Sequence, residues 1–439
     1  MSTPHPAFRC IVACALVGAG LAGAAADGPA IASTTAARTD PVATDGSSVP
    51  TTYYLDATNG DDADAGTSES AAWKTLARAT AGSLKPGDRL LLRRGGRWSG
   101  RLELAESGTA AAPITVGAYG MGDRPVVTGD CVVIKGSYVV ARDLHAENCA
   151  FAAVDVFGGD NRVEGNLLIH NVAAVFLRGG SARNAVVRND MIDNDKMSVL
   201  TATPTNDDAG AFGVLLHGDA NEIAYNTISG SNAFSYDYGH DGGAIEVYGG
   251  QGNAIHHNLA VDNDAFAELG HSRSADNTFA YNVVRSSAPR STFLVTRGGA
   301  DSFGPVLRTR LYNNTALLTG AEAQGFVCYA GCGPGILTMR NNVIQATLKA
   351  GYADAPFDED HNLYAGGIRQ FAMGPHSLAA GPRFVDPAAW DLRLQATSPA
   401  IDRGVPVGYA TDFDARPAGQ DGDGDGSAAP DLGAYEYTG

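Results

Sequence analysis

The sequence predicts an all-β solenoid, in which short parallel strands stack as successive coils, with one short helix near the N-terminal end. Three observations favour this fold class. Hydrophobic residues make up 44% of the 439 residues, which supplies a sizeable core and excludes a disordered chain. Glycine contributes 55 residues, against roughly 7% in an average protein, and it lacks the period of three that indicates collagen. A motif with two apolar strands recurs about every 22–24 residues.

The N-terminal residues are typical of a leader and a linker. Arg9 is the only charged residue before an apolar run from Ile11 to Ala26, so residues 1–32 are predicted to be a secretion signal. The run is too short and too rich in glycine to span a membrane. Residues 33–52 are small and polar and include proline, which predicts a flexible linker. We therefore expect a secreted, extracellular protein.

Residues 53–98 are predicted to form the N-terminal strand and helical cap. The strand is expected at Tyr53–Asp56, ahead of a turn-rich segment. The following stretch, 71–81, has helical periodicity. It places one apolar face on Trp73, Leu76, Ala77 and Thr80.

The repeat itself predicts parallel strands over residues 99–380. Each copy reads as asparagine, a short apolar strand, a second asparagine and another apolar strand, and the strands alternate with period two. Helical repeats need longer apolar runs, and the leucine pattern of a horseshoe is missing. The second asparagines are expected to stack at a turn, bonded to one another and to the backbone. They are Asn166, Asn189, Asn226, Asn258 and Asn282. Residues 381–439 are predicted to be a loop-rich C-terminal end.

Charge and cysteine content narrow the partners and the compartment. The net charge is −17, and no basic stripe is present, which argues against a nucleic-acid partner. Four cysteines follow the leader, an even number that favours disulfides in an oxidising compartment. Of the three connectivities, we predict Cys131–Cys149 and Cys328–Cys332.

Residues 53–439 resemble the pectate-lyase-like superfamily of right-handed parallel β-helix proteins. The resemblance is carried by YYLDATNGDDADAGTSESAAWKTL, LKPGDRLLLRRGGRW and SGTAAAPITVGAYG at the start, and by DLRLQATSPAIDRG and DLGAYEY at the end. It implies a right-handed parallel β-helix in a secreted bacterial protein. It leaves the reaction open, because the superfamily includes polysaccharide lyases, hydrolases, epimerases and adhesins.

The segment 236–273 holds the densest group of residues suited to catalysis. Aligning AIEVYG with FAELGH points Ile245 and Ala267 inward and stacks Glu246 on Glu268, one coil apart. Neighbouring parallel strands lie about 4.8 Å apart, so the two carboxylates repel each other and need an explanation. Two carboxyl groups at about 5 Å suit a retaining glycosidase. Asp241 is a third candidate. The alternatives are a calcium site and a solvated surface pair.

The resemblance also supports a second hypothesis, that the protein is a polysaccharide lyase. Glu268 followed by Leu-Val-Thr-Arg297-Gly is similar to the catalytic strip of alginate- and chondroitin-cleaving β-helix lyases. The resemblance implies that Glu268 binds calcium and that Arg297 takes the arginine role. Arg273 stands where those lyases have a lysine base, so His271 or His240 would substitute as the base. The Tyr-Gly-His-Asp order at 238–241 matches a mannuronan epimerase poorly.

Aromatic and cationic side chains near this segment are candidates for binding sugar. Tyrosine rings cover the apolar faces of pyranoses, and arginine binds uronate carboxylates in a bidentate manner. The predicted substrate-binding residues are Tyr236, Tyr238, Tyr248 and Arg273.

A calcium loop is predicted near the C-terminus. Asp421, Asp423 and Asp425, followed by Gly426, place oxygen ligands at the first, third and fifth positions before a sharp turn. The twelfth position is leucine, so we expect Asp431 to substitute for the usual glutamate. The calcium is predicted to be structural, and catalytic if the protein is a lyase.

Taken together, these patterns predict a secreted, monomeric enzyme that cleaves an extracellular polysaccharide in a groove along the coils. Insertions at 195–211 and 232–242 are expected to form one wall of the groove. Hydrolysis by Glu246 and Glu268, assisted by Asp241, is favoured over β-elimination. The other alternative is a non-catalytic carbohydrate-binding or adhesion β-helix, without a membrane span.

Overall fold

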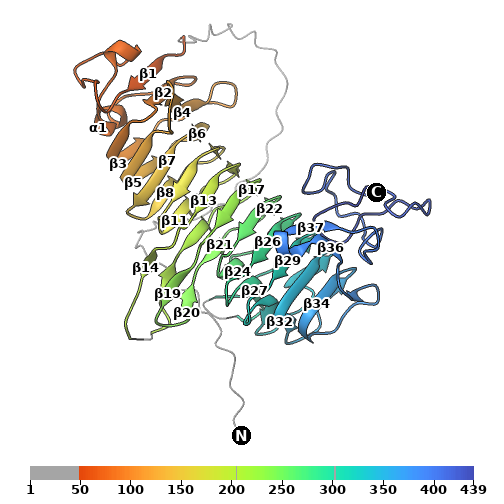
Figure 1. Ribbon diagram of the computed structural model, residues 1–439. Helices are drawn as coiled ribbons and strands as arrows, with labels where there is room; N and C mark the ends of the chain where they lie inside the picture. The colour runs from red at the N-terminus through yellow and green to blue at the C-terminus, as the bar shows by residue number, and fades with distance from the viewer. Residues whose placement is uncertain (1–48, 204, 301–302) are drawn as a thin grey trace, which may run out of the picture.

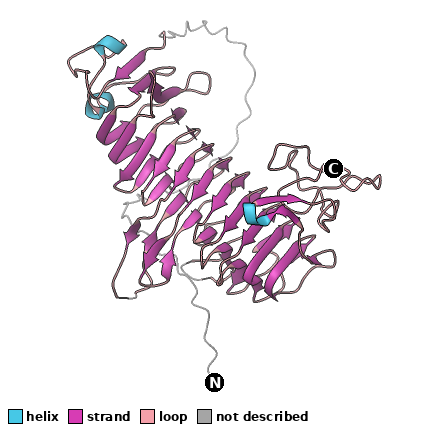
Figure 2. Cartoon of the chain, in the orientation of Figure 1, coloured by secondary structure: helices cyan, strands magenta, loops and turns pink. Residues whose placement is uncertain are grey.

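The computed structural model describes residues 49–203, 205–300 and 303–439. The predicted secretion signal and most of the predicted linker lie outside the described residues. Within the described part the chain is almost entirely strand and turn, and the strands stack into one elongated body (Figures 1 and 2). None of the helices described there has the length and apolar composition needed to cross a membrane.

Two long parallel sheets run the length of the solenoid. The 12-stranded sheet contains β1 (Thr52–Leu55), β2 (Arg89–Arg93), β4 (Ile114–Tyr119), β6 (Val139–Arg142), β9 (Arg162–Glu164), β12 (Ala185–Val187), β17 (Glu222–Ala224), β22 (Ala254–His256), β25 (Thr278–Ala280), β28 (Thr309–Tyr312), β31 (Leu337–Arg340) and β33 (Asp358–Asp360).

The 19-stranded sheet contains the other two strands of each coil. They are β3 (Arg97–Leu104), β5 (Val126–Ile134), β7 (His145–Cys149), β8 (Ala152–Val156), β10 (Leu167–Ile169), β11 (Ala173–Leu177), β13 (Asp190–Ile192), β16 (Phe212–Leu216), β18 (Thr227–Ser229), β21 (Gly243–Tyr248), β23 (Leu259–Val261), β24 (Ala265–Gly270), β26 (Val283–Ser286), β27 (Thr292–Arg297), β29 (Thr315–Leu318), β30 (Gln324–Tyr329), β32 (Val343–Ala353), β34 (Leu363–Gln370) and β35 (Leu378–Ala379).

Three antiparallel hairpins leave these sheets. They pair β14 (Met197–Val199) with β15 (Ala209–Gly210), β19 (Ala233–Ser235) with β20 (Gly239–Asp241), and β36 (Phe384–Asp386) with β37 (Asp391–Leu394). The first two lie in the insertions that the sequence placed at 195–211 and 232–242. A 3-10 turn, η2 (Pro387–Ala389), lies inside the third.

The N-terminal helix is shorter than the sequence predicted. In place of one helix over 71–81, the chain forms a 3-10 turn, η1 (Glu69–Ala71), and one α-helical turn, α1 (Leu76–Thr80). The helix begins late because the Thr75 hydroxyl accepts a hydrogen bond from the Arg78 N–H and caps it there. Its buried side chains are Leu76 and Ala79 rather than Ala77. That α1 serves as a cap of the solenoid stays a prediction, as do the domain boundaries.

The predicted asparagine ladder is confirmed. Asn226 and Asn258 are 1% and 0% exposed, and the Asn226 amide donates to the Asn258 side-chain oxygen at 2.9 Å. Asn258 continues the ladder to Asn282 at 3.0 Å and also donates to the Ile223 carbonyl at 2.8 Å. These bonds satisfy backbone groups at a turn that no strand pairing reaches, which explains why asparagine recurs there.

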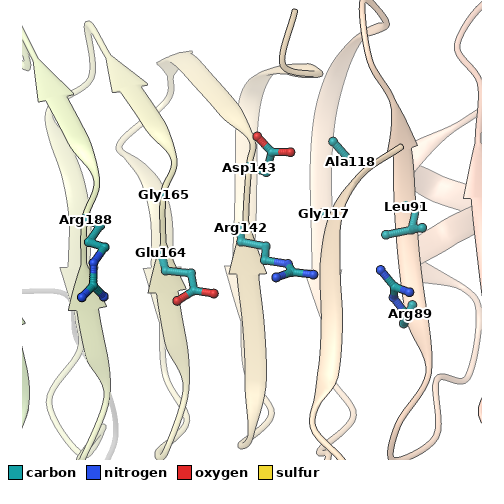
Figure 3. A pocket seen from close by; sticks show the side chains of 9 residues that line it. All are labelled: Arg89, Leu91, Gly117, Ala118, Arg142, Asp143, Glu164, Gly165 and Arg188. Carbon is teal, nitrogen blue, oxygen red and sulfur yellow. The ribbon is translucent and has the colours of Figure 1, made fainter. Parts of the chain in front are cut away.

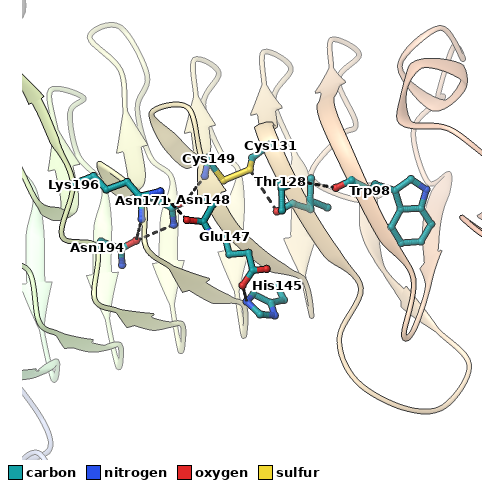
Figure 4. The surroundings of a disulfide bond; sticks show 11 residues. Trp98, Thr128, Cys131, His145, Glu147, Asn148, Cys149, Asn171, Asn194 and Lys196 are labelled. Atoms are coloured by element: carbon teal, nitrogen blue, oxygen red, sulfur yellow. Dashed lines mark hydrogen bonds and ion pairs between the residues drawn. A yellow bond between two sulfur atoms is a disulfide. The ribbon is translucent and has the colours of Figure 1, made fainter.

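Both predicted disulfides are confirmed. Cys131 in β5 and Cys149 at the end of β7 are bonded, with 5.7 Å between their α-carbons, and both are buried. Figure 4 shows this bond beside the Asn171 and Asn194 side chains, which form another asparagine pair at 2.9 Å. Cys328 and Cys332 form the second bond, with 5.5 Å between their α-carbons.

Removing the Cys131–Cys149 bond is expected to destabilise the fold more than removing Cys328–Cys332. The first bond spans 18 residues and the second spans 4. Chain entropy then assigns about 3 and about 2 kcal/mol to the two bonds. Urea unfolding of the two double alanine variants, followed by circular dichroism, measures the difference. A larger loss for the Cys328–Cys332 variant would contradict this ranking.

Candidate active site

The paired glutamates lie where the sequence predicted them. In the register of β21 and β24, Glu246 is opposite Glu268, and Ile245 and Val247 are opposite the core residues Ala267 and Leu269. Because side chains alternate across a strand, both carboxylates leave the sheet on the face away from the core. The pair is more enclosed than a surface groove implies, since Glu246 is 4% exposed and Glu268 is 3% exposed.

Arg297 lies next to Glu268. It is the last residue of β27, which pairs with β24 in the sheet. Its Nη2 is 3.3 Å from Glu268 Oε1. The guanidinium is 1% exposed and lies 5.0 Å from the centre of the Tyr329 ring. A buried carboxylate needs such a compensating charge, because desolvation of an uncompensated ion is costly. The structure therefore brings three of the predicted catalytic residues, Glu246, Glu268 and Arg297, onto adjacent strands.

Asp264 joins this group, although it is not among the catalytic residues predicted from the sequence. It directly precedes β24 and is fully buried. The Glu246 carboxylate points toward the start of β21, because its Oε2 lies 3.8 Å from the position that a Cβ on Gly243 would occupy. Gly243 pairs with Ala265 in β24, and Ala265 directly follows Asp264. Arg290 faces Asp264 with Nε 3.7 Å from Oδ1. The sequence signal that could have indicated Asp264 is an aspartate directly before an apolar strand.

The two insertions are joined to each other, as predicted for a single wall. The Asp237 carboxylate accepts backbone N–H bonds from Thr205 and Asp207 at 2.9 and 2.7 Å, and Asp208 accepts from the Ser235 hydroxyl at 2.8 Å. Although burial raises the pKa of Asp208, the hydrogen bond from Ser235 and backbone N–H bonds from Thr201 and from the 232–242 insertion hold it below its ordinary value. Arg290 also donates to the Tyr238 carbonyl, so the wall is connected to Asp264 through one arginine.

The remaining candidates in the 232–242 insertion are more exposed. Tyr236 is 47% exposed and packs edge-to-face against Phe234, with 4.9 Å between ring centres. The Tyr238 hydroxyl donates to the Asn206 side chain at 3.0 Å. His240 is exposed, and its Nδ1 shares a hydrogen bond with the Asn232 side chain at 2.8 Å. Asp241 accepts a hydrogen bond from the Gly242 N–H at 2.9 Å.

His271 and Tyr248 belong to a ladder of rings on the following turn. Their ring centres are 5.0 Å apart, and His217 and Phe176 extend the ladder over the preceding coils at 5.7 and 4.9 Å. Burial, with a smaller contribution from Arg178, lowers the pKa of His217 to about 4, so this ring is neutral near pH 7. Sequence reasoning missed His217 and Phe176, because they follow no motif and meet only when the coils stack.

Arg273 is held away from a role as base or substrate ligand by its contacts at the turn after β24. Its guanidinium contacts the Asp219 carboxylate and the Gly249 carbonyl, and its backbone N–H donates to His271 Nδ1 at 3.0 Å. These contacts place it at the turn, whereas Arg297 is the arginine that reaches Glu268. The structure thus favours Arg297 over Arg273 as the arginine of the site.

The predicted calcium loop forms only in part. Asp421 and Asp423 converge with Asp402, and their oxygens lie within 4.8 Å of one another. Asp402 therefore takes the place that the sequence gave to Asp425 or Asp431. Asp431 is instead fully buried, and it accepts backbone N–H bonds from Asp402 and Tyr437 at 2.7 and 2.6 Å. Calcium at this loop stays a prediction.

Asp431 and its neighbour Glu436 give the protein an expected pH dependence. Burial raises the pKa of each carboxyl to about 7. Between about pH 4 and pH 7 the folded protein keeps protons that the unfolded chain releases, so the free energy of unfolding falls as the pH rises, by up to about 1.4 kcal/mol per pH unit for each proton. Thermal unfolding across this range measures the slope. Glu436→Gln should flatten it, and an unchanged slope would contradict the assignment.

A separate groove lies on the 12-stranded sheet and has mixed charge (Figure 3). It has a volume of about 370 Å³ and presents Arg89, Arg142 and Arg188 together with Asp143 and Glu164. The sequence indicated no basic stripe, and the fold gathers these arginines from every second coil, since they lie in or directly after β2, β6 and β12. Because Asp143 and Glu164 lie among the arginines, the groove does not present a continuous basic surface.

Comparison with known proteins supports the fold and one local relationship. No family model matches the chain. A stretch of 93 residues, 20% of this chain, is 45% identical to lacto-N-biosidase of Bifidobacterium longum subsp. longum and spans 6% of that protein. Pectate lyase Pel9A has a TM-score of 0.57 and 16% identity, over 89% of this chain and 98% of its own. An alginate lyase from Paenibacillus sp. str. FPU-7 has a TM-score of 0.50 and 16% identity, over 70% and 97%. The chain has the pectate-lyase-like parallel β-helix fold.

Proposed function

We propose that this protein is a carbohydrate-active enzyme, favoured as a glycoside hydrolase, with its active site at Glu246 and Glu268. The observation that carries the proposal is the register of β21 and β24, which sets two nearly buried carboxylates opposite each other. Like charges in adjacent coils oppose folding, so their placement favours a chemical role over a structural one.

The spacing supports hydrolysis with retention of configuration. Adjacent parallel strands are about 4.8 Å apart, close to the roughly 5–5.5 Å between the carboxyl groups of retaining glycosidases. Glu268 is assigned as the nucleophile, because Arg297 supplies the compensating charge for an ionised carboxylate. Glu246 is assigned as the acid that protonates the leaving oxygen and then as the base that activates water. Asp241, and Asp264 directly before β24, are assigned as further carboxylates of the site.

The local sequence relationship supports the same class of chemistry. The matched relative is named as a lacto-N-biosidase, a glycosidase, and the identity of 45% over 93 residues is well above that of the structural neighbours. The match covers a small part of both chains, so it supports the class of reaction and leaves the sugar to experiment.

Calcium-assisted β-elimination is the second candidate, because the resemblance gives both Glu268 and Arg297 a role in a lyase and the two residues lie side by side. The site suits calcium poorly, however. A calcium ion on Glu268 would face the guanidinium 3.3 Å away, and like charges in a buried site repel strongly. Calcium therefore has no part in the proposed hydrolysis.

Secretion is part of the proposal. Two disulfides join the described residues, and such bonds persist in oxidising compartments. An extracellular polysaccharide or oligosaccharide is the corresponding substrate.

Digestion of a glycan panel tests the proposal. The panel includes lacto-N-biosides and uronic-acid polymers, and both reducing ends and the ultraviolet absorbance of unsaturated uronates are followed. New reducing ends without that absorbance are expected for a hydrolase. Reducing ends together with the absorbance would establish the lyase, and neither signal would favour the non-catalytic binding alternative.

A further inference from the structure

A second group of ligand-forming side chains lies at the C-terminal end of the solenoid, away from Glu246 and Glu268. It consists of Asp360 at the end of β33, His361 next to it, and His376 in the loop between β34 and β35. One oxygen or nitrogen from each residue lies within 4.8 Å of the others. None of the three was singled out from the sequence, because fifteen residues separate the two histidines.

Asp360 is oriented by the backbone on one side and faces both imidazoles on the other. Its Oδ1 accepts N–H bonds from His361 and His376 at 2.9 and 2.8 Å. Its Oδ2 lies 2.8 Å from His376 Nδ1 and 3.4 Å from His361 Nδ1. The outward-facing oxygen and the two nitrogens therefore converge on one point.

The two rings are held in place to present these nitrogens. They are stacked, with 4.5 Å between the ring centres and 22° between their planes. His361 Nδ1 is a buried atom that makes no hydrogen bond with any described residue. A buried polar atom that makes no hydrogen bond is costly, and a bound ion would remove that cost.

The spacing fits a metal of the zinc class. Ligands at about 2.0–2.2 Å from a tetrahedral zinc ion lie about 3.3–3.5 Å from one another, so the separations of 2.8 and 3.4 Å need little adjustment. Two imidazoles and one carboxylate suit zinc better than calcium, which prefers oxygen ligands alone.

The surroundings leave room for a fourth ligand and favour a cation. His361 and His376 line a cavity of about 670 Å³ whose lining also includes Asp402, Asp423 and Arg403. The two carboxylates outnumber the one cation, so the cavity has a net attraction for a divalent ion. His376 is exposed, so solvent can reach the three ligand-forming side chains.

We propose that Asp360, His361 and His376 bind one zinc-class divalent cation, with the fourth position open to the cavity. The ion would tie the loop between β34 and β35 to the turn after β33. This proposal is independent of the glycosidase assignment, since it involves other residues and is read out by binding alone.

Calorimetric titration of Zn²⁺ into the tag-free, EDTA-treated protein tests the site. One Zn²⁺ per chain is expected, and His376→Ala should raise the Kd at least about 100-fold, because even outer-shell partners of zinc ligands are worth 10–100-fold. His170→Ala is the matched control, a partly exposed histidine that also faces a carboxylate, Asp195, at 3.4 Å. It should leave the Kd unchanged.

Asp423→Asn separates this site from the neighbouring acidic loop. If Asp423→Asn abolishes Zn²⁺ binding while His376→Ala does not, the ion is held by the loop and the proposal is overturned. Absence of stoichiometric binding by the wild-type protein overturns it as well. Equal unfolding temperatures of wild type and His376→Ala in EDTA verify that the variant is folded, and Zn²⁺ should raise the temperature of the wild type alone.

Discussion

Replacing either Glu246 or Glu268 by glutamine is expected to lower kcat on a cleaved glycan by at least about 1,000-fold. Glutamine keeps the shape of the side chain but can neither attack the sugar as a nucleophile nor exchange a proton with it, and acid–base catalysis alone contributes about 10²–10⁴-fold. Both residues are nearly buried, on adjacent strands, so each substitution removes one half of the pair. Initial rates on the substrate found in the panel measure the loss.

Glu322→Gln is the matched control for this prediction. Glu322 is exposed on the turn before β30, so its substitution should leave kcat within about twofold of wild type and stability within about 0.5 kcal/mol. Circular dichroism of each variant checks that the solenoid is folded. A folded Glu246→Gln and a folded Glu268→Gln that both keep wild-type rates would remove the active site from this pair.

Replacing Asn258 by alanine is expected to cost at least about 3 kcal/mol of folding free energy. The Asn258 side chain accepts from the backbone N–H and the amide of Asn226, at 3.0 and 2.9 Å, and donates to the Ile223 carbonyl at 2.8 Å. Alanine leaves those three buried groups without their partner, at about 1–3 kcal/mol each. Urea unfolding followed by circular dichroism measures the change.

Asn148→Ala tests whether the effect belongs to the ladder. Asn148 is exposed and accepts one hydrogen bond, from the Lys196 ammonium at 2.8 Å, which Figure 4 shows near the disulfide. Its replacement should cost about 1–2 kcal/mol, mainly because alanine adopts the positive φ of Asn148 less readily than asparagine does. A similar loss for both variants would mean that the ladder adds nothing beyond ordinary surface asparagines.

The sequence predicted the solenoid because its repeat carries both the strand period and the turn. Asn226 and Asn258 recur at the same point of each coil, and apolar residues alternate around them. Once two coils are aligned, the register follows, and with it the opposition of Glu246 and Glu268. The even cysteine count predicted that disulfides form, and the structure has the predicted one of the three connectivities.

Other features depend on contacts that one coil cannot reveal. The burial of Glu246 and Glu268 results from packing with neighbouring segments, which strand alternation does not describe. Helix α1 is shorter than its periodicity predicted because Thr75 caps it, and Trp73 is used in a bridge to Leu55 instead. Asp402 entered the acidic loop from about twenty residues away, too far for a motif to indicate.

The configuration of the first product formed tests the central assignment most directly. Proton NMR of the anomeric signal, recorded before mutarotation, distinguishes the two stereochemical outcomes of hydrolysis. Retention is predicted, because carboxylates on adjacent strands are close enough for one to attack the sugar while the other protonates the leaving oxygen. Inversion would contradict the assignment, since it needs carboxyl groups about 6.5–9.5 Å apart with a water molecule between them.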